Sequence, residues 1–193
     1  EHALFPGQRK QLPGIGSRSG TRLFADDMLT GQDRRLCHRV MLGIDRGNIT
    51  AITMPGFGTT NRTYNNAVNM IKELGATFKE ISIKNACMQH FKDIEHDINI
   101  HDVTYENSQA RERTQILMDY ANKIGALHMG TGDMSELALG WATYNGDQMS
   151  MYGINSSIPK TLVKHLVNWI AEQENNNGNT TVFNVLKDVL NTP

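Results

Sequence analysis

The most informative part of the chain is the stretch Ala126-Leu-His-Met-Gly-Thr-Gly-Asp-Met-Ser-Glu136, continued by Leu-Ala-Leu-Gly-Trp141-Ala-Thr-Tyr144. Residues 126–129 predict a short buried strand, and residues 130–132 predict a turn with backbone freedom and little bulk. Asp133 or Ser135 can then cap a helix, which would carry Leu137, Ala138 and Trp141. Where a strand is followed by a Gly-rich turn and a helix, the free N–H groups of the helix N-terminus point above the edge of the sheet. This geometry suits an anionic or polar ligand. Short Gly-containing turns between a strand and a helix are also common in proteins where they bind no ligand.

The composition is that of a soluble globular protein. The chain has 193 residues, of which 39% are hydrophobic and 20% charged, enough for one domain with a sizeable core. A net charge of −1 argues against broad binding to nucleic acid or anionic membrane. No apolar run approaches the ~20 residues that cross a bilayer, and we see no signal peptide. Cys37 and Cys87 lack metal or redox spacing, which favours a reducing cytoplasm.

Strands and helices alternate from Met41 onwards. A doubly wound parallel sheet of the α/β class is the expected result, with ligands at the carboxyl ends of its strands. The loops 55–62 and 130–133 both follow strands, so they should open on the same edge. Thr60 or Asn61 can cap the first helix. The predicted strands are 48–54 and 78–83, and the predicted helices lie before Gly75 and over 86–94 and 106–124.

The last third of the chain begins with a polar stretch, residues 145–158. A loop of that length in a compact domain is typical of a lid or binding loop, or is disordered. Pro159 then begins a helix with a buried stripe, since proline is favoured in a first turn. Residues 172–181 contain several asparagines and predict an exposed linker, and 182–190 predict a last short helix.

Residues 1–40 differ in composition from the rest. Most of the arginines lie between Arg9 and Arg46, and at best an irregular helix is expected over 23–29. The run Gly14-Ile-Gly-Ser-Arg-Ser-Gly-Thr21 could surround a phosphate, because small residues leave backbone N–H groups free. It lacks the Gly-Lys-Ser/Thr ending of a P-loop. A surface segment or a disordered arm is the alternative.

Two groups of side chains invite other chemistry. The residues His90, Asp93, His96, Asp97, His101 and Asp102 are of metal-ligand type, but their spacing favours a solvated polar loop. Cys87 beside them is better interpreted as a buried, inert thiol than as a nucleophile.

Arg111 could reach an anionic ligand, whereas Arg113 could pair with an acid or face water. Trp141 is expected to be partly core.

Several motifs closely resemble the synthetase domain of NAD synthetase, nearest the glutamine-dependent, two-domain bacterial type. The resemblance runs from about Met41 to Trp169 within a domain expected over 41–174, with a truncated end at 175–193. Residues 53–60 also resemble the loop after the second strand of the family's ATP-pyrophosphatase fold. The motifs are Thr104-Tyr-Glu-Asn-Ser-Gln-Ala-Arg111-Glu-Arg, Gly130-Thr-Gly-Asp-Met-Ser-Glu-Leu-Ala-Leu-Gly-Trp-Ala-Thr-Tyr144, Gly146-Asp147 and Ile158-Pro-Lys-Thr161.

The resemblance implies an ATP-dependent ligase that uses Mg²⁺ and performs the last step of NAD biosynthesis. The nicotinate carboxylate of deamido-NAD is adenylylated with release of pyrophosphate, and ammonia then displaces AMP to give NAD. It also implies a homo-oligomer, and a nitrilase-like glutaminase domain that makes ammonia from glutamine and is absent here. The loop 146–158 would close to exclude water from the acyl-adenylate.

The resemblance also assigns residues. ATP contacts are implied for Thr131, Lys160 and Met54. Glu136 matches a residue that contacts Mg²⁺ or deamido-NAD. The deamido-NAD contacts are Asn107, Arg111, Glu136, Trp141, Ala142, Thr143 and Tyr144.

The chain departs from the family at one motif. The family's pyrophosphate loop, Ser-Gly-Gly-x-Asp-Ser, should follow the first strand, where residues 14–21 offer no Gly-Gly and no suitably placed Asp. We therefore expect the isolated chain to make NAD very slowly or not at all. The alternatives are an impaired nucleotide-binding fragment, or a tRNA-thiolating or GMP-forming enzyme of the same fold, although such enzymes should not combine Asn107 and Arg111 with the 141–144 motif.

Overall fold

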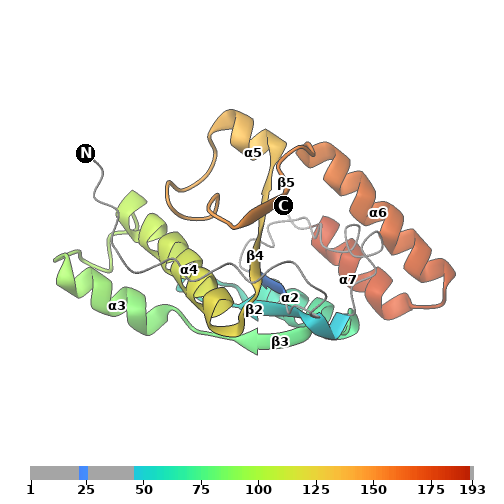
Figure 1. Cartoon of the computed structure of the whole chain (residues 1–193), viewed down its shortest axis with the longest axis horizontal. Helices are drawn as coiled ribbons and strands as arrows, with labels where there is room; N and C mark the ends of the chain where they lie inside the picture. The colour runs from blue at the N-terminus through green and yellow to red at the C-terminus, as the bar shows by residue number, and fades with distance from the viewer. Residues whose placement is uncertain (1–21, 26–45, 192–193) are drawn as a thin grey trace.

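A computed structural model describes residues 22–25 and 46–191 of the chain (Figure 1). Within these residues, a five-stranded sheet has the order β3-β2-β1-β4-β5, and every neighbouring pair is parallel. The predicted doubly wound α/β fold is therefore confirmed, because the chain runs outward from β1 in both directions. The strands are β1 (Arg22–Ala25), β2 (Ile49–Thr53), β3 (Thr77–Glu80), β4 (Leu127–Asp133) and β5 (Tyr152–Asn155).

Strand β1 occupies the centre of the sheet and pairs with β2 on one side and β4 on the other. The irregular helix that we predicted over 23–29 is therefore wrong for residues 23–25. The local sequence has no clear strand period, and pairing on both sides overrides this weak signal. The remaining residues of the 1–40 segment, including the candidate phosphate loop 14–21 and Cys37, lie outside the described part of the chain. Residues 14–21 nevertheless precede β1 in the sequence, so the expectation that they occupy the place of the loop after the first strand is wrong.

Helices cover both faces of the sheet. One apolar cluster joins β2, α3 and α4 around Ile52, Phe91 and Leu117, and the other joins α2, α6 and α7. Figure 1 shows α3 and α4 side by side at one end of the molecule, with α6 and α7 at the other. No described helix is long and apolar enough to cross a membrane. The helices are α2 (Asn61–Glu73), α3 (Lys84–Asp93), α4 (Val103–Ile124), α5 (Met134–Leu139), α6 (Lys160–Asn176) and α7 (Thr180–Leu190), and a 3-10 turn, η1 (Arg46–Asn48), precedes β2.

Capping residues determine where helices α2 and α4 begin and where α2 ends. The Thr60 side chain accepts a hydrogen bond from Thr63 N at 3.2 Å, so the predicted cap of α2 is confirmed. Gly75, with φ of 67°, follows the end of the same helix in the left-handed region, as predicted. Asp102 caps α4 by accepting from Thr104 N and Tyr105 N, so α4 begins at Val103, three residues earlier than expected.

Two predicted loops are part of the sheet. Residues 130–132 continue β4 instead of forming a turn, and the pairing with β5 becomes irregular between Gly130 and Asp133. Glycine is needed at 130 because a Cβ there would collide with the side chain of Ser150. The predicted loop 145–158 contains the edge strand β5. Its local sequence does not predict a strand, and its pairing with β4 makes it one.

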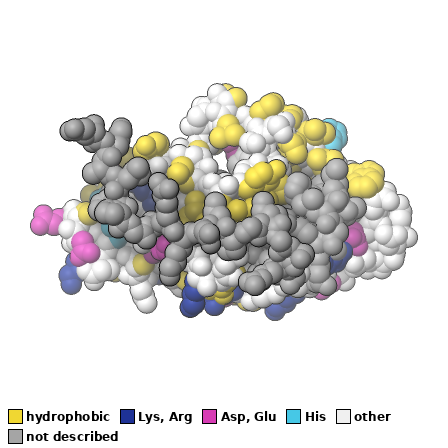
Figure 2. Space-filling model, in the orientation of Figure 1, with side chains coloured by type: hydrophobic (Ala, Val, Ile, Leu, Met, Phe, Trp, Pro, Cys, Tyr) yellow, Lys and Arg dark blue, Asp and Glu magenta, His cyan; other side chains and the backbone are white. Residues whose placement is uncertain are grey.

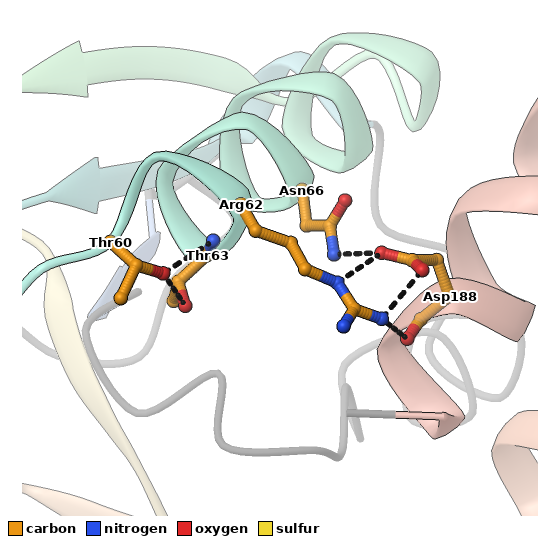
Figure 3. A network of polar contacts seen from close by, with 5 residues as sticks. All are labelled: Thr60, Arg62, Thr63, Asn66 and Asp188. Carbon is orange, nitrogen blue, oxygen red and sulfur yellow. Dashed lines mark hydrogen bonds and ion pairs between the residues drawn. The ribbon is translucent and has the colours of Figure 1, made fainter. Parts of the chain in front are cut away.

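The C-terminal helix α7 is tied to α2 by a polar network (Figure 3). Arg62 Nη2 and Nε donate to the Asp188 carboxylate at 2.7 and 3.2 Å, and Asn66 donates to it as well. These contacts hold the pKa of Asp188 below its usual range. The predicted linker over 172–181 is mostly helical, since α6 runs to Asn176 and α7 begins at Thr180. Packing between α6 and α7 overrides the poor helix propensity of the asparagines.

Candidate functional site

A cavity of about 210 Å³ lies at the carboxyl edge of the sheet. Its lining includes Thr131 near the end of β4, Met54 directly after β2, and Arg113 of α4. Met54 and Thr131 therefore lie at one edge of the sheet, as the alternation predicts, although residues 130–133 belong to β4 and do not form the expected loop. In parallel sheets this edge is where ligands bind.

The two residues of this cavity that were predicted to contact ATP differ in accessibility. Thr131 is partly exposed, and its carbonyl oxygen accepts from Asn155 Nδ2 at 3.4 Å. The Met54 side chain is fully buried, so an ATP contact would have to come from the loop that follows it. The Met54 carbonyl oxygen accepts from Arg113 Nε at 3.4 Å, a contact that the sequence did not predict.

Four of the residues predicted to bind deamido-NAD contact one another. The Thr143 hydroxyl donates to Asn107 Oδ1 at 2.9 Å, and Arg111 Nε donates to the Tyr144 carbonyl oxygen at 3.0 Å. Residues 107 and 111 are one turn apart on α4, so they present their side chains on one face of that helix. The structure therefore brings together two sequence motifs whose contacting residues are 33 and 36 positions apart, and they form one polar surface that also borders Ala142.

A second group of predicted residues meets beside this surface. Lys160 Nζ lies 3.9 Å from Glu136 Oε1 and 5.9 Å from the centroid of the Trp141 ring. The lysine side chain is 42% exposed, so this ion pair adds little to stability. An exposed ammonium beside an aromatic face is well suited to contact an anionic nucleotide group.

The amides at the start of α5 are engaged within the chain. Asp133 and Glu136 form a capping box, in which each side chain accepts from the other residue's backbone N–H at 2.8 and 2.9 Å. Met134 N donates to the Ile158 carbonyl oxygen at 3.1 Å. Asp133 is thus the cap, as predicted. The expectation that free amides at this helix start face a ligand is therefore wrong for Asp133, Met134 and Glu136, whose N–H groups are bonded within the chain.

Trp141 lies outside helix α5 and is 75% exposed, so the predicted partly buried position is wrong. Helix α5 has six residues and ends at Gly140, whose φ of 65° lies in the left-handed region. Trp141 N donates back to the Glu136 carbonyl oxygen at 2.9 Å, which completes a Schellman-type helix end. The ring consequently projects beyond the helix, beside Lys160.

Two residues of the site region escaped prediction. Asp147 accepts from Thr143 N at 2.6 Å and so fixes the turn that follows Thr143. Asp147 belongs to the Gly146-Asp147 motif of the sequence analysis, but no role was predicted for it. His128 is 3% exposed, and its Nδ1 has no hydrogen-bond partner among the described residues. Burial lowers the pKa of His128 from 6.5 to about 4, so this side chain is neutral at pH 7.

The other candidate chemistries receive no support. No group of three metal-ligating side chains forms among residues 22–25 and 46–191. In the His- and Asp-rich stretch, Asp102 caps α4, and Asp97 accepts hydrogen bonds from Asn99 that lower its pKa. Cys87 is buried, which raises the pKa of its thiol to about 11, so it is inert as predicted.

The profile of the NAD synthase family matches residues 29–176. The chain belongs to the NAD synthase family. Glutamine-dependent NAD(+) synthetases of Mycobacterium leprae and Mycobacterium tuberculosis H37Rv are 45% and 43% identical to it over 155 residues. The aligned part is 78% of this chain and 22% of each relative, so the chain spans about a fifth of their length.

Solved structures agree with this membership. The glutamine-dependent NAD+ synthetase of Acinetobacter baumannii, in complex with ADP, superposes with a TM-score of 0.67 and is 26% identical. The match covers 87% of this chain and 32% of that one. The NH3-dependent NAD synthetase of Campylobacter jejuni has a TM-score of 0.68 at 19% identity, over 91% and 85% of the two chains, and supports the fold. The ATP-pyrophosphatase fold is therefore confirmed.

Proposed function

We propose that the chain is the synthetase portion of a glutamine-dependent NAD synthetase, an ATP-dependent ligase that amidates deamido-NAD. One observation carries this proposal beyond family membership. The α4 residues Asn107 and Arg111 are hydrogen-bonded to Thr143 and Tyr144, so four of the residues assigned to deamido-NAD form one surface. This surface adjoins Lys160, the exposed cation assigned to ATP.

The proposed reaction has two steps. An oxygen of the nicotinate carboxylate attacks the α-phosphorus of ATP, and the bond to pyrophosphate breaks. Ammonia then attacks the carbonyl carbon of the acyl-adenylate, and the bond to AMP breaks with loss of a proton. Both steps need two substrates held in line and cations near the phosphates. Lys160 and Arg111 would supply positive charge, and Asn107 would orient the dinucleotide.

ATP is the proposed nucleotide, supported by the ADP complex of the Acinetobacter baumannii relative. Mg²⁺ would arrive with ATP, because Mg²⁺ is usually held by one or two carboxylates together with substrate phosphates. Glu136 is the proposed carboxylate. Its Oε2 accepts from Asp133 N, and its Oε1 lies 3.9 Å from Lys160 Nζ, so Glu136 alone does not form a metal site.

The source of ammonia is proposed from the relatives' names. The Mycobacterium leprae relative is a glutamine-dependent synthetase, so a nitrilase-like glutaminase domain is the proposed partner that releases ammonia from glutamine. We also propose that the protein works as a homo-oligomer in the cytoplasm. The alternative is an impaired nucleotide-binding fragment, which the absence of a Ser-Gly-Gly-x-Asp-Ser motif from the sequence favours.

Calorimetric titration of the chain with deamido-NAD, and separately with ADP, tests the proposal. We expect both to bind, and NAD formation from deamido-NAD, ATP and ammonia to be slow or absent. Binding of ADP without deamido-NAD would favour a generic nucleotide-binding domain. If neither ligand bound, the proposed function would be wrong.

A further inference from the structure

Two side chains of α4 fix the loop directly after β2, residues 54–57. Gln109 Oε1 accepts from Phe57 N at 3.1 Å, and Arg113 Nε donates to the Met54 carbonyl oxygen at 3.4 Å. Gln109 is 6% exposed, and its Nε2 donates to the Tyr105 carbonyl oxygen at 3.1 Å. Both the oxygen and the nitrogen of this buried amide therefore have partners. Moving the loop would leave a buried polar group unpaired, which is costly.

Gly56 lies between these two contacts, and its backbone packs on the ends of both side chains. A Cβ at this position would lie 2.6 Å from Gln109 Oε1 and 2.7 Å from Arg113 Nη2. The Phe57 ring adds an apolar contact, with its centroid 5.9 Å from that of Tyr105. Hydrogen bonds, close backbone packing and an aromatic contact thus all join this loop to α4.

This loop lies at the carboxyl edge of the central sheet, beside the cavity that Thr131 lines. We propose that Gln109 and Arg113 are positioning residues that hold loop 54–57 in the conformation that receives an adenine nucleotide. They act through the loop backbone, from the side of the loop that faces α4. The inference rests on the proposed function, because it takes this loop as part of the nucleotide site.

The test combines amide hydrogen exchange without ligand and calorimetric titration with ADP, both on the full chain. Gln109→Met keeps the length of the side chain but removes the acceptor for Phe57 N. We expect exchange at Phe57 to accelerate, and ADP to bind more weakly, each by about tenfold or more. Gln109→Glu keeps an acceptor and should retain most of both properties. Gln115→Ala, at an exposed position of the same helix, is the matched control and should change neither.

Arg113→Met provides a second route to the same result if Gln109→Met does not fold, as judged by circular dichroism. It should release the Met54 carbonyl oxygen and weaken ADP binding while Gln109 stays in place. Unchanged ADP affinity in both folded variants would overturn the positioning role, whether or not exchange at Phe57 accelerates. If the wild-type chain did not bind ADP, the proposed function would fail instead, and wild-type exchange at Phe57 would still report whether α4 holds the loop.

Discussion

The two sides of the candidate site differ in how they are held. On the α4 side, loop 54–57 rests on a buried glutamine and on an apolar cluster that contains Phe91. On the α5 side, the segment 139–144 is attached through polar contacts at its edge, and the side chains of Leu139, Trp141 and Tyr144 are 76%, 75% and 74% exposed. Figure 2 shows hydrophobic side chains gathered on the visible surface in the region of α5. One side is preformed, whereas the other leaves apolar surface for a ligand or partner to cover.

The largest expected effect contrasts one aromatic residue from each side. Phe91→Ala should lower the free energy of unfolding by about 3–5 kcal/mol, because it opens a cavity in a cluster where Phe91 is 2% exposed. Trp141→Ala should change that free energy by less than about 0.5 kcal/mol, since the ring is in solvent. It should instead weaken binding of deamido-NAD. Urea denaturation of both variants measures the contrast, and equal destabilisation would contradict it.

His128, on β4, should make stability depend on pH. Its folded pKa of about 4 lies below the ordinary value of 6.5, so between these values the unfolded chain binds more protons. Stability should therefore fall as the pH drops from about 6.5 to about 4, by up to about 3 kcal/mol. His128→Leu should remove this part of the dependence. It should also stabilise the protein at pH 7, because it removes a buried nitrogen that has no hydrogen-bond partner in the described part of the chain.

Urea denaturation of wild type and His128→Leu at pH 7 and pH 4.5 isolates the histidine, because all other titrating groups are common to both proteins. The gap in stability between the two should widen at the lower pH. A gap that stayed constant with pH would show that His128 is protonated in the folded chain as readily as in the unfolded one.

A smaller effect is expected within loop 54–58 itself. Gly56→Ala should cost about 1–3 kcal/mol, because the new methyl group displaces the hydrogen-bonded ends of Gln109 and Arg113. Gly58→Ala, two residues on, meets no atom within 4 Å and should be neutral or slightly stabilising. Thermal unfolding of the pair reports the difference. If both substitutions cost the same, the tight contact between this loop and α4 would be in doubt.

The sequence predicted the elements whose signals are local. Strand β2 and helix α2 combine an apolar pattern with recognisable ends, Thr60 and Gly75, and both were located closely. Strands β1 and β5 were missed because pairing with β4, rather than their own composition, makes them strands. Trp141 was placed inside a helix because Gly140 was not recognised as its end.

In the candidate site, too, residues within sequence motifs were predicted, and residues defined by distant contacts were not. Family resemblance indicated Asn107, Arg111, Glu136 and Lys160. In the structure, Asn107 and Arg111 contact the 143–144 segment, and Lys160 lies near Glu136 beside that surface. The resemblance gave no role to Gln109, whose partner Phe57 N is 52 residues away in the sequence. A buried amide that meets a distant backbone group leaves no periodic or motif signal, so its role appears only in the folded chain.

Amide hydrogen exchange with and without saturating deamido-NAD shows whether the residues of α4 and the 139–144 segment form one dinucleotide site. We predict that amides over 139–151 gain protection in the complex, while those over 54–58, already held by Gln109 and Arg113, change little. Binding that left 139–151 unchanged and protected only another surface would contradict this account.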